Sequence, residues 1–327
     1  MYVFKYPSVI GIEITNRCNL NCIHCINSSS INDKQELSFD TIKLIIDYMH
    51  QHGIICLDIS GGEPFLHPRI YDILEYAYSR NLNISMATNG TFLTQDNINI
   101  LKQYSVSTRV SYDGYNEDTF SIVRGKGIYQ KVYNNVKNAI ISNLGITLVT
   151  VLHANNVDNV ELYIKTAKEL GVRKLRLMPF VPDGRGSNSG LKFMSPLQWK
   201  YILENYEKWA KYYGIKIALD SPLMSITHHL VCPCVVGKFY LVIKSNGDAV
   251  PCALLDMPIG NIYHNTIDEI WQSPTLTEIN DISLLNEECH QCEYLQACAG
   301  GCRGMAYKIK GSYLCKDPLC WLQSQNK

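Results

Sequence analysis

The sequence predicts an α/β fold, a partial (β/α)6 barrel followed by a small cysteine-rich domain. Short apolar segments alternate with amphipathic helical patterns up to about residue 180. At 327 residues, the chain exceeds the roughly 100–200 residues of a usual domain, so one large or two ordinary domains are expected. Nine of the thirteen cysteines lie between Cys232 and Cys320, beyond the repeating part.

The repeating part contains six candidate strands: Val9–Ile14, Ile54–Ser60, Asn83–Thr88, Ser107–Tyr112, Ile146–Leu152 and Lys174–Met178. Helical patterns fill the intervals: Phe39–His50, Pro68–Arg80, Gln95–Gln103, Tyr129–Ser142 and Val157–Leu170. Strict alternation of strand and helix predicts a parallel sheet, curved as a partial TIM-like barrel, because crossover helices must return each strand to the same direction. Functional groups are then expected on the loops that follow the strands.

The helix expected over Phe39–His50 shows the signals on which these assignments depend. Ser38 stands where an N-cap side chain accepts the first free backbone N–H groups, and Gly53 suits a left-handed C-cap. The apolar positions recur every three or four residues, at Ile42, Ile45, Ile46 and Met49.

The segment PDGRGSNSG, residues 182–190, is rich in turn formers and interrupts the repeat. One more helix is expected over Pro196–Tyr213, and a strand-like stretch over Ile215–Leu219. Beyond these the repeat stops and cysteines dominate. The predicted domains are therefore 1–225, the barrel, and 226–327, the cysteine-rich domain.

Composition excludes several classes of protein. Thirty basic residues balance thirty acidic ones, so no net field favours nucleic acid or an anionic membrane surface. No run of about 18 apolar residues and no export signal occur, which predicts a cytoplasmic protein without a membrane anchor. An odd cysteine count in a long chain without an export signal favours metal ligation over disulfides.

The segment CNLNCIHC places Cys18, Cys22 and Cys25 on a short loop after the first strand. Three thiolates can bind three irons of a four-iron, four-sulfur cubane and leave the fourth iron free to bind a ligand. The alternative is a zinc site, to which His24 would contribute a fourth ligand.

This CxxxCxxC loop resembles that of the radical S-adenosylmethionine (SAM) superfamily, and the resemblance covers about residues 8–180. Gly61, Gly62, Glu63 and Pro64 follow the second strand and resemble the superfamily's GGEP motif, which contacts the SAM amino group. Two glycines allow close approach of the backbone, and a carboxylate pairs with an ammonium group.

The resemblance implies further SAM contacts at the ends of later strands. Ser111 and Arg124 are candidates for the ribose or the methionine carboxylate, Met178 for packing on adenine, and the His24 backbone for meeting adenine. Each has a structural alternative: Ser111 as a turn former, Arg124 as a surface charge and Met178 as a core residue. The glycine-rich fifth-strand motif of many members is not recognisable here.

The resemblance also implies the reaction. The reduced cluster passes an electron to SAM, which breaks into methionine and a 5′-deoxyadenosyl radical that abstracts a substrate hydrogen. The electron is expected from a low-potential donor such as flavodoxin or ferredoxin. No catalytic acid or base is assigned.

The C-terminal cysteines resemble the SPASM extension of radical SAM enzymes, which holds up to two auxiliary four-iron clusters. By this resemblance Cys234, Cys252 and Cys302 bind the first, with Cys232 as a fourth ligand. The second uses Cys289, Cys292, Cys298 and Cys320. The rival assignment exchanges Cys320 for Cys315. A pair of structural zinc ribbons is the other alternative, and it would make the chain a zinc-stabilised binding protein.

Two substrate classes stay open. Most SPASM enzymes modify ribosomally made peptides or proteins, and others act on tetrapyrrole side chains. Only 17 residues precede Cys18, fewer than a separate peptide-recognition domain needs, which weakens the peptide hypothesis without removing it. Ala253 follows Cys252 where sulfatase-maturing enzymes typically have aspartate, which argues against that branch. Peptide or protein modification is placed slightly ahead of tetrapyrrole modification.

Overall fold

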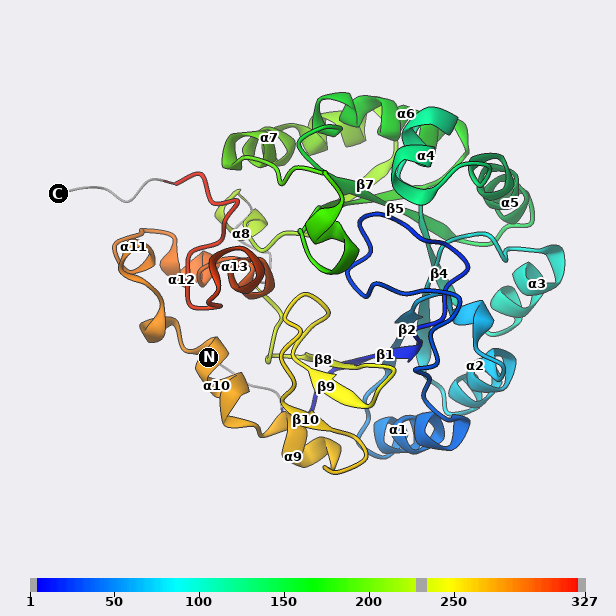
Figure 1. Cartoon of the computed structure of the whole chain (residues 1–327), viewed down its shortest axis with the longest axis horizontal. Coiled ribbons are helices and arrows are strands. Elements are labelled where there is room, and N and C mark those ends of the chain that lie inside the picture. Colours follow the sequence, from blue (N-terminus) through cyan, green and yellow to red (C-terminus); the bar gives the residue numbers. More distant parts are fainter. Residues whose placement is uncertain (1–4, 228–233, 323–327) are drawn as a thin grey trace.

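The computed structural model describes residues 5–227 and 234–322, and its centre is a ten-stranded sheet in the order β10-β9-β8-β1-β2-β3-β4-β5-β6-β7. Seven parallel strands follow chain order: β1 (Val9–Thr15), β2 (Cys56–Gly61), β3 (Asn83–Thr88), β4 (Ser107–Ser111), β5 (Ile146–Leu152), β6 (Lys174–Pro179) and β7 (Lys216–Leu219). Figure 1 shows these strands curving around the centre of the molecule with helices outside them. The predicted α/β partial barrel is confirmed.

The helices of the repeating part connect successive strands. They are α1 (Phe39–Gln51), α2 (Ile70–Ser79), α3 (Gln95–Gln103), α4 (Glu117–Arg124), α5 (Tyr129–Ile141), α6 (Val160–Glu169), α7 (Pro196–Tyr213) and α8 (Met224–Thr227). Capping residues determine where these helices begin and end. The Ser38 hydroxyl accepts the Thr41 backbone N–H at the start of α1, and α7 ends at Gly214 in the left-handed conformation.

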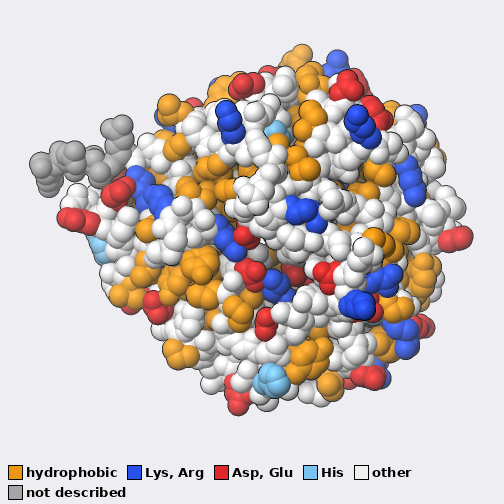
Figure 2. All heavy atoms as spheres, in the orientation of Figure 1, with side chains coloured by type: hydrophobic (Ala, Val, Ile, Leu, Met, Phe, Trp, Pro, Cys, Tyr) orange, Lys and Arg blue, Asp and Glu red, His pale blue; other side chains and the backbone are white. Residues whose placement is uncertain are grey.

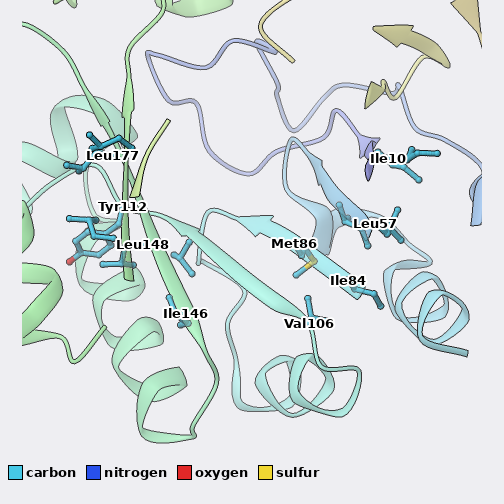
Figure 3. Packing of buried hydrophobic residues seen from close by; sticks show 14 of the residues in the cluster. Ile10, Leu57, Ile84, Met86, Val106, Tyr112, Ile146, Leu148 and Leu177 are labelled. Atoms are coloured by element: carbon cyan, nitrogen blue, oxygen red, sulfur yellow. The ribbon is translucent and has the colours of Figure 1, made fainter. Parts of the chain in front are cut away.

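The core lies between the sheet and the outer helices. Alternate strand residues point outward and are almost fully buried, as Ile10, Leu57, Met86, Leu148 and Leu177 show. Figure 3 shows these side chains lining one face of the curved sheet. Because side chains alternate along a strand, the residues between them face the interior of the barrel.

The interior face is polar. The Arg109 guanidinium on β4 lies 2.5 Å from an Asp58 carboxylate oxygen on β2, across the intervening strand. Arg176 on β6 forms an ion pair with Asp220, just after β7. The outward positions of the strands are therefore apolar and packed against the helices, whereas the inward positions carry charged side chains and give the barrel a polar lumen.

The C-terminal region extends the same sheet. Strand β8 (Tyr240–Ile243) pairs in parallel with β1, so that Val9 lies opposite Tyr240. β9 (Asp248–Val250) and β10 (Gly260–Asn261) continue in antiparallel fashion. The remaining helices, shown in orange and red in Figure 1, are α9 (Ile267–Trp271), α10 (Pro274–Asn280), α11 (Glu287–His290), α12 (Leu295–Cys298) and α13 (Arg303–Lys310).

Four strands, β7 to β10, add to the six expected in the repeating part. β7 corresponds to the strand-like stretch Ile215–Leu219, whereas the pairing of β8 with β1 was not predicted. The boundary proposed near residue 225 falls within α8. None of the helices in the described ranges is both long enough and apolar enough to span a bilayer.

Candidate functional site

The first cysteine group lies on the loop between β1 and α1. Cys18 and Cys22 are each 8% exposed, and Cys25 is half-buried. The loop is held by Arg185, whose Nε donates to the Cys22 carbonyl at 2.9 Å and whose Nη1 donates to the Ser29 carbonyl at 2.7 Å. The turn-rich segment 182–190 therefore fixes the cysteine loop. No role was assigned to Arg185 from the sequence.

Two side-chain N–H groups point at the sulfur atoms of this loop. Asn89 Nδ2 lies 3.8 Å from Cys18 Sγ, and Arg124 Nη1 lies 3.8 Å from Cys22 Sγ. Burial raises the pKa of Cys18 to about 11 and also raises that of Cys22. Three clustered thiols with N–H donors suit an iron–sulfur cluster, since such donors stabilise charge on cluster sulfur and tune its potential.

The GGEP segment packs directly on the cysteine loop. Gly62 N donates to the Thr15 carbonyl at 2.7 Å, and Glu63 N donates to the Arg17 carbonyl at 2.8 Å. A Cβ atom on Gly61 would lie 2.2 Å from the Thr15 oxygen, and one on Gly62 would lie 2.2 Å from the Arg17 oxygen. Glycine is required here because the motif backbone touches the loop that carries the cysteines.

Glu63 differs from the expected ammonium-binding carboxylate in its immediate partners. Its side chain is 0% exposed and accepts the Thr88 hydroxyl at 2.9 Å and the Asn89 backbone N–H at 2.7 Å. Burial raises its pKa to about 7. The carboxylate therefore ties β2 to the end of β3, while Gly61 and Gly62 stay partly exposed beside the cysteines.

Substituting Gly62 by alanine tests this packing. The new Cβ must displace backbone, so we expect a loss of about 1–3 kcal/mol of stability and weaker SAM binding. Thermal unfolding and SAM titration of the anaerobically reconstituted protein measure the two effects. Gly145→Ala is the control, because a Cβ there meets nothing within 4 Å. Equal melting temperatures for the two variants would contradict the steric explanation.

Arg124 and His24 meet at a buried carboxylate. Asp113 is 1% exposed, and one of its oxygens lies 2.6 Å from Arg124 Nη2 and 3.2 Å from His24 Nε2. Burial alone would raise the pKa of Asp113, but Arg124 and His24 hold it below its ordinary value. Arg124 is therefore a buried cation and not a surface charge, and Asp113 orients its guanidinium toward Cys22.

Ser111 and Met178 are half-buried on inward positions of β4 and β6, at the carboxyl ends of those strands. The structure thus places both at the same end of the barrel as Gly61 and Gly62. The strand register alternates these inward positions with fully buried neighbours such as Leu177.

The C-terminal cysteines form two groups. In the first group, burial is the largest cause that raises the pKa of Cys302. Cys234 and Cys252 are close enough to raise it further. Leu255 N donates to Cys252 Sγ at 3.3 Å, and Met305 N donates to Cys302 Sγ at 3.5 Å. Cys232, the expected fourth ligand, lies outside the described residues.

The second group lines a cavity between α8 and the C-terminal segment. Its cysteines are the four expected for the second auxiliary cluster: Cys289, Cys292, Cys298 and Cys320. Cys315 is not among the lining residues, which favours Cys320 as the ligand. Within residues 5–227 and 234–322, no three Cys, His, Asp or Glu side chains converge on a single-ion site. Thiols spread around a cavity fit a cluster, whose irons each take a different ligand, better than one zinc ion.

Cys320→Ala and Cys315→Ala separate the two ligand assignments. We expect Cys320→Ala to lose about four iron atoms per chain, one cubane, because a coordinating thiolate is removed. Cys315→Ala should keep the full iron content, since its side chain lies outside the cavity. Iron and sulfide analysis after anaerobic reconstitution measures this. The opposite pattern would assign Cys315 to the cluster.

Charged side chains on the interior face of the sheet and on later segments of the chain form ion pairs. Besides the Arg109–Asp58 and Arg176–Asp220 pairs, Lys244 lies 2.8 Å from Asp256 and Lys308 lies 2.9 Å from Asp183. Figure 2 shows basic and acidic side chains together around the hollow at the centre of this face. Each of these four cations has a carboxylate partner.

Comparisons with known proteins agree with this geometry. A radical SAM superfamily model matches residues 12–167, and a SPASM model, described as an iron-sulfur cluster-binding domain, matches residues 232–293. The chain is 30% identical to the AdoMet-dependent heme synthase of Methanosarcina barkeri (strain Fusaro / DSM 804), covering 96% of each chain.

Two further proteins are similar to this chain, one in sequence and one in fold. The chain is 28% identical to mycofactocin maturase MftC of Mycolicibacterium smegmatis, over 96% of this chain and 82% of that one. Streptococcus suis SuiB bound to precursor peptide SuiA has the same fold, with a TM-score of 0.81 and 17% identity over 98% of this chain and 77% of that one.

Proposed function

Because this chain belongs to the radical SAM superfamily and carries a C-terminal SPASM domain, we propose that its three-cysteine loop and GGEP segment bind a four-iron cluster and SAM together. The observation that carries this is the contact of the two motifs: Gly62 and Glu63 are hydrogen-bonded to the backbone that leads into Cys18. A ligand on the open iron would therefore also meet the GGEP backbone.

When bound, the cluster and SAM supply reductive carbon–sulfur cleavage, which yields methionine and a 5′-deoxyadenosyl radical that abstracts a substrate hydrogen. The protein's residues prepare the site for this. Asn89 and Arg124 stabilise charge on the ligating sulfurs, and Asp113 keeps Arg124 oriented. The polar positions at Ser111 and the apolar surface of Met178 are available for the ribose and adenine.

The two C-terminal cysteine groups are proposed to hold two auxiliary clusters. Four thiolates per cluster leave no open iron, which favours electron transfer over direct binding of substrate. Reduction by a low-potential donor such as flavodoxin or ferredoxin, and a cytoplasmic location where such donors occur, belong to the same proposal.

The substrate is proposed to be a ribosomally made peptide or protein side chain. Four cations, Arg109, Arg176, Lys244 and Lys308, are already paired with carboxylates. A tetrapyrrole with several carboxylates would have to break these pairs to bind through these four cations, whereas a peptide of mixed charge need not. The fold shared with SuiB, solved with its precursor peptide, is in keeping with this choice.

Tetrapyrrole side-chain modification is the second candidate, and one observation favours it. The relative named AdoMet-dependent heme synthase shares 30% identity over 96% of both chains, more than the 28% shared with the mycofactocin maturase. Incubation with a precursor peptide encoded beside the gene and with a propionate-bearing tetrapyrrole, followed by mass spectrometry, separates the candidates. A mass change in only one substrate decides between them.

Anaerobic reconstitution tests the activity itself. An enzyme of this kind contains about four iron and four sulfide atoms per cluster and releases 5′-deoxyadenosine from SAM when dithionite is added. A zinc-stabilised binding protein contains zinc without sulfide and leaves SAM intact. That second result would overturn the proposal.

A further inference from the structure

One buried cation lies beside the C-terminal cysteines. Arg303, the first residue of α13, is 2% exposed, and its Nη1 donates to the Tyr313 carbonyl at 3.3 Å. Within the part of the chain that the structure describes, no Asp or Glu forms an ion pair with it. The guanidinium stays protonated in proteins, so this is a buried positive charge.

Arg303 lies between the two cysteine groups. Its backbone follows Cys302 of the first group directly. Its Nη1 would lie 2.6 Å from a Cβ on Gly300, and Gly300 lines the cavity of the second group. Burial lowers the pKa of Arg303, and cysteines of both groups are close enough to oppose that shift as thiolates: Cys234, Cys289, Cys298 and Cys302.

The nearby buried carboxylate does not serve as its partner. Asp317 is 2% exposed, and its oxygens accept the Cys302 backbone N–H at 2.7 Å and the Leu319 backbone N–H at 2.8 Å. Asp317 therefore braces the loops that carry Cys302 and Cys320. The charge of Arg303 is left to be balanced by something else.

A buried, unpaired charge is strongly unfavourable, so native proteins supply a counter-charge. A cubane held by four thiolates is a net anion and becomes more negative on reduction. We propose that Arg303 is a counter-ion shared by the two auxiliary clusters: it raises both reduction potentials and links cluster loading to folding of the C-terminal domain. This inference rests on the proposed function, because it requires that both groups hold clusters.

Redox titration of Arg303→Met tests the shared role. The full chain is reconstituted in a background with Cys18, Cys22 and Cys25 changed to alanine, so that EPR reports only the auxiliary clusters. The reduction potentials of both auxiliary clusters should fall. At a fixed applied potential, the ratio of reduced to oxidised cluster should be at least tenfold smaller, which is equivalent to 59 mV for a one-electron couple. Arg303→Lys, which keeps the charge, should recover part of the shift. Arg173→Met is the control because Arg173 is exposed.

Potentials unchanged in Arg303→Met, or a shift in only one cluster, would overturn the shared role. Urea unfolding of the apo-protein gives a second readout. The uncompensated charge predicts that Arg303→Met apo-protein is at least as stable as the parent, whereas cluster loading stabilises the parent more. A less stable Arg303→Met apo-protein would contradict the inference. Failure of the parent to assemble any iron–sulfur cluster would instead contradict the proposed function.

Discussion

Changing Cys18, Cys22 and Cys25 together to alanine is expected to abolish SAM cleavage. The three side chains provide every protein ligand proposed for the catalytic cluster, and no other cysteine within residues 5–227 and 234–322 joins their buried group. Iron content should fall by about four atoms per chain, while the auxiliary clusters persist. The measurements are 5′-deoxyadenosine release with dithionite and iron analysis after anaerobic reconstitution.

Cys56→Ala is the matched control for this experiment. Cys56 is half-buried at the start of β2, away from the carboxyl ends where the cysteine loop lies. It should retain both cleavage and iron. If the triple variant still cleaves SAM, these three cysteines are not the ligands of the catalytic cluster, whatever the C-terminal cysteine groups bind.

Asp113→Asn is expected to give the largest loss of stability among the single substitutions considered. Asp113 pairs with Arg124 at 2.6 Å, with the two side chains 1% and 7% exposed, and accepts the Val151 backbone N–H at 2.7 Å. Removing one charge of a buried pair typically costs about 3–5 kcal/mol, because the other charge is left uncompensated. For a chain of this size the melting temperature should fall by about 4–7 °C. SAM affinity should also fall, since Arg124 loses its orientation.

Asp72→Asn provides the comparison, because it makes the same chemical change in an exposed pair. Asp72 pairs with Arg69, and their side chains are 45% and 50% exposed. Surface pairs contribute about 0–1 kcal/mol, so little change in melting temperature is expected. Similar losses in the two variants would show that Asp113 does not act as a buried counter-ion.

Strand and helix positions of the barrel were largely predictable because their signals are local. Asn83–Thr88, Ile146–Leu152 and Gln95–Gln103 were predicted with the bounds that the structure has. Apolar periodicity and capping residues determine such elements without knowledge of the rest of the chain. The motif cysteines were predictable for the same reason, since their spacing along the loop is itself the signal.

Long-range partners were not predictable. The burial of Glu63 depends on Thr88 and Asn89, about 25 residues away, and the role of Arg185 depends on carbonyl groups more than 150 residues earlier. Helix α4, which positions Arg124, was missed although it carries a capping box of Asn116 and Thr119. Threonine replaces the usual Glu or Gln at the third position of that box, so the pattern was harder to recognise.

The pairing of β1 with β8 has a consequence for biosynthesis. β1 leads into the loop of Cys18, yet one of its two neighbours, at Tyr240–Ile243, is more than 220 residues later in the chain. At ribosomal speeds of about 5–20 residues per second, β8 leaves the ribosome some 10–50 s after β1. Since contacts between distant segments form late, the catalytic loop gains its full support only when translation is nearly complete. Iron delivery to the nascent enzyme should therefore follow translation of the C-terminal region.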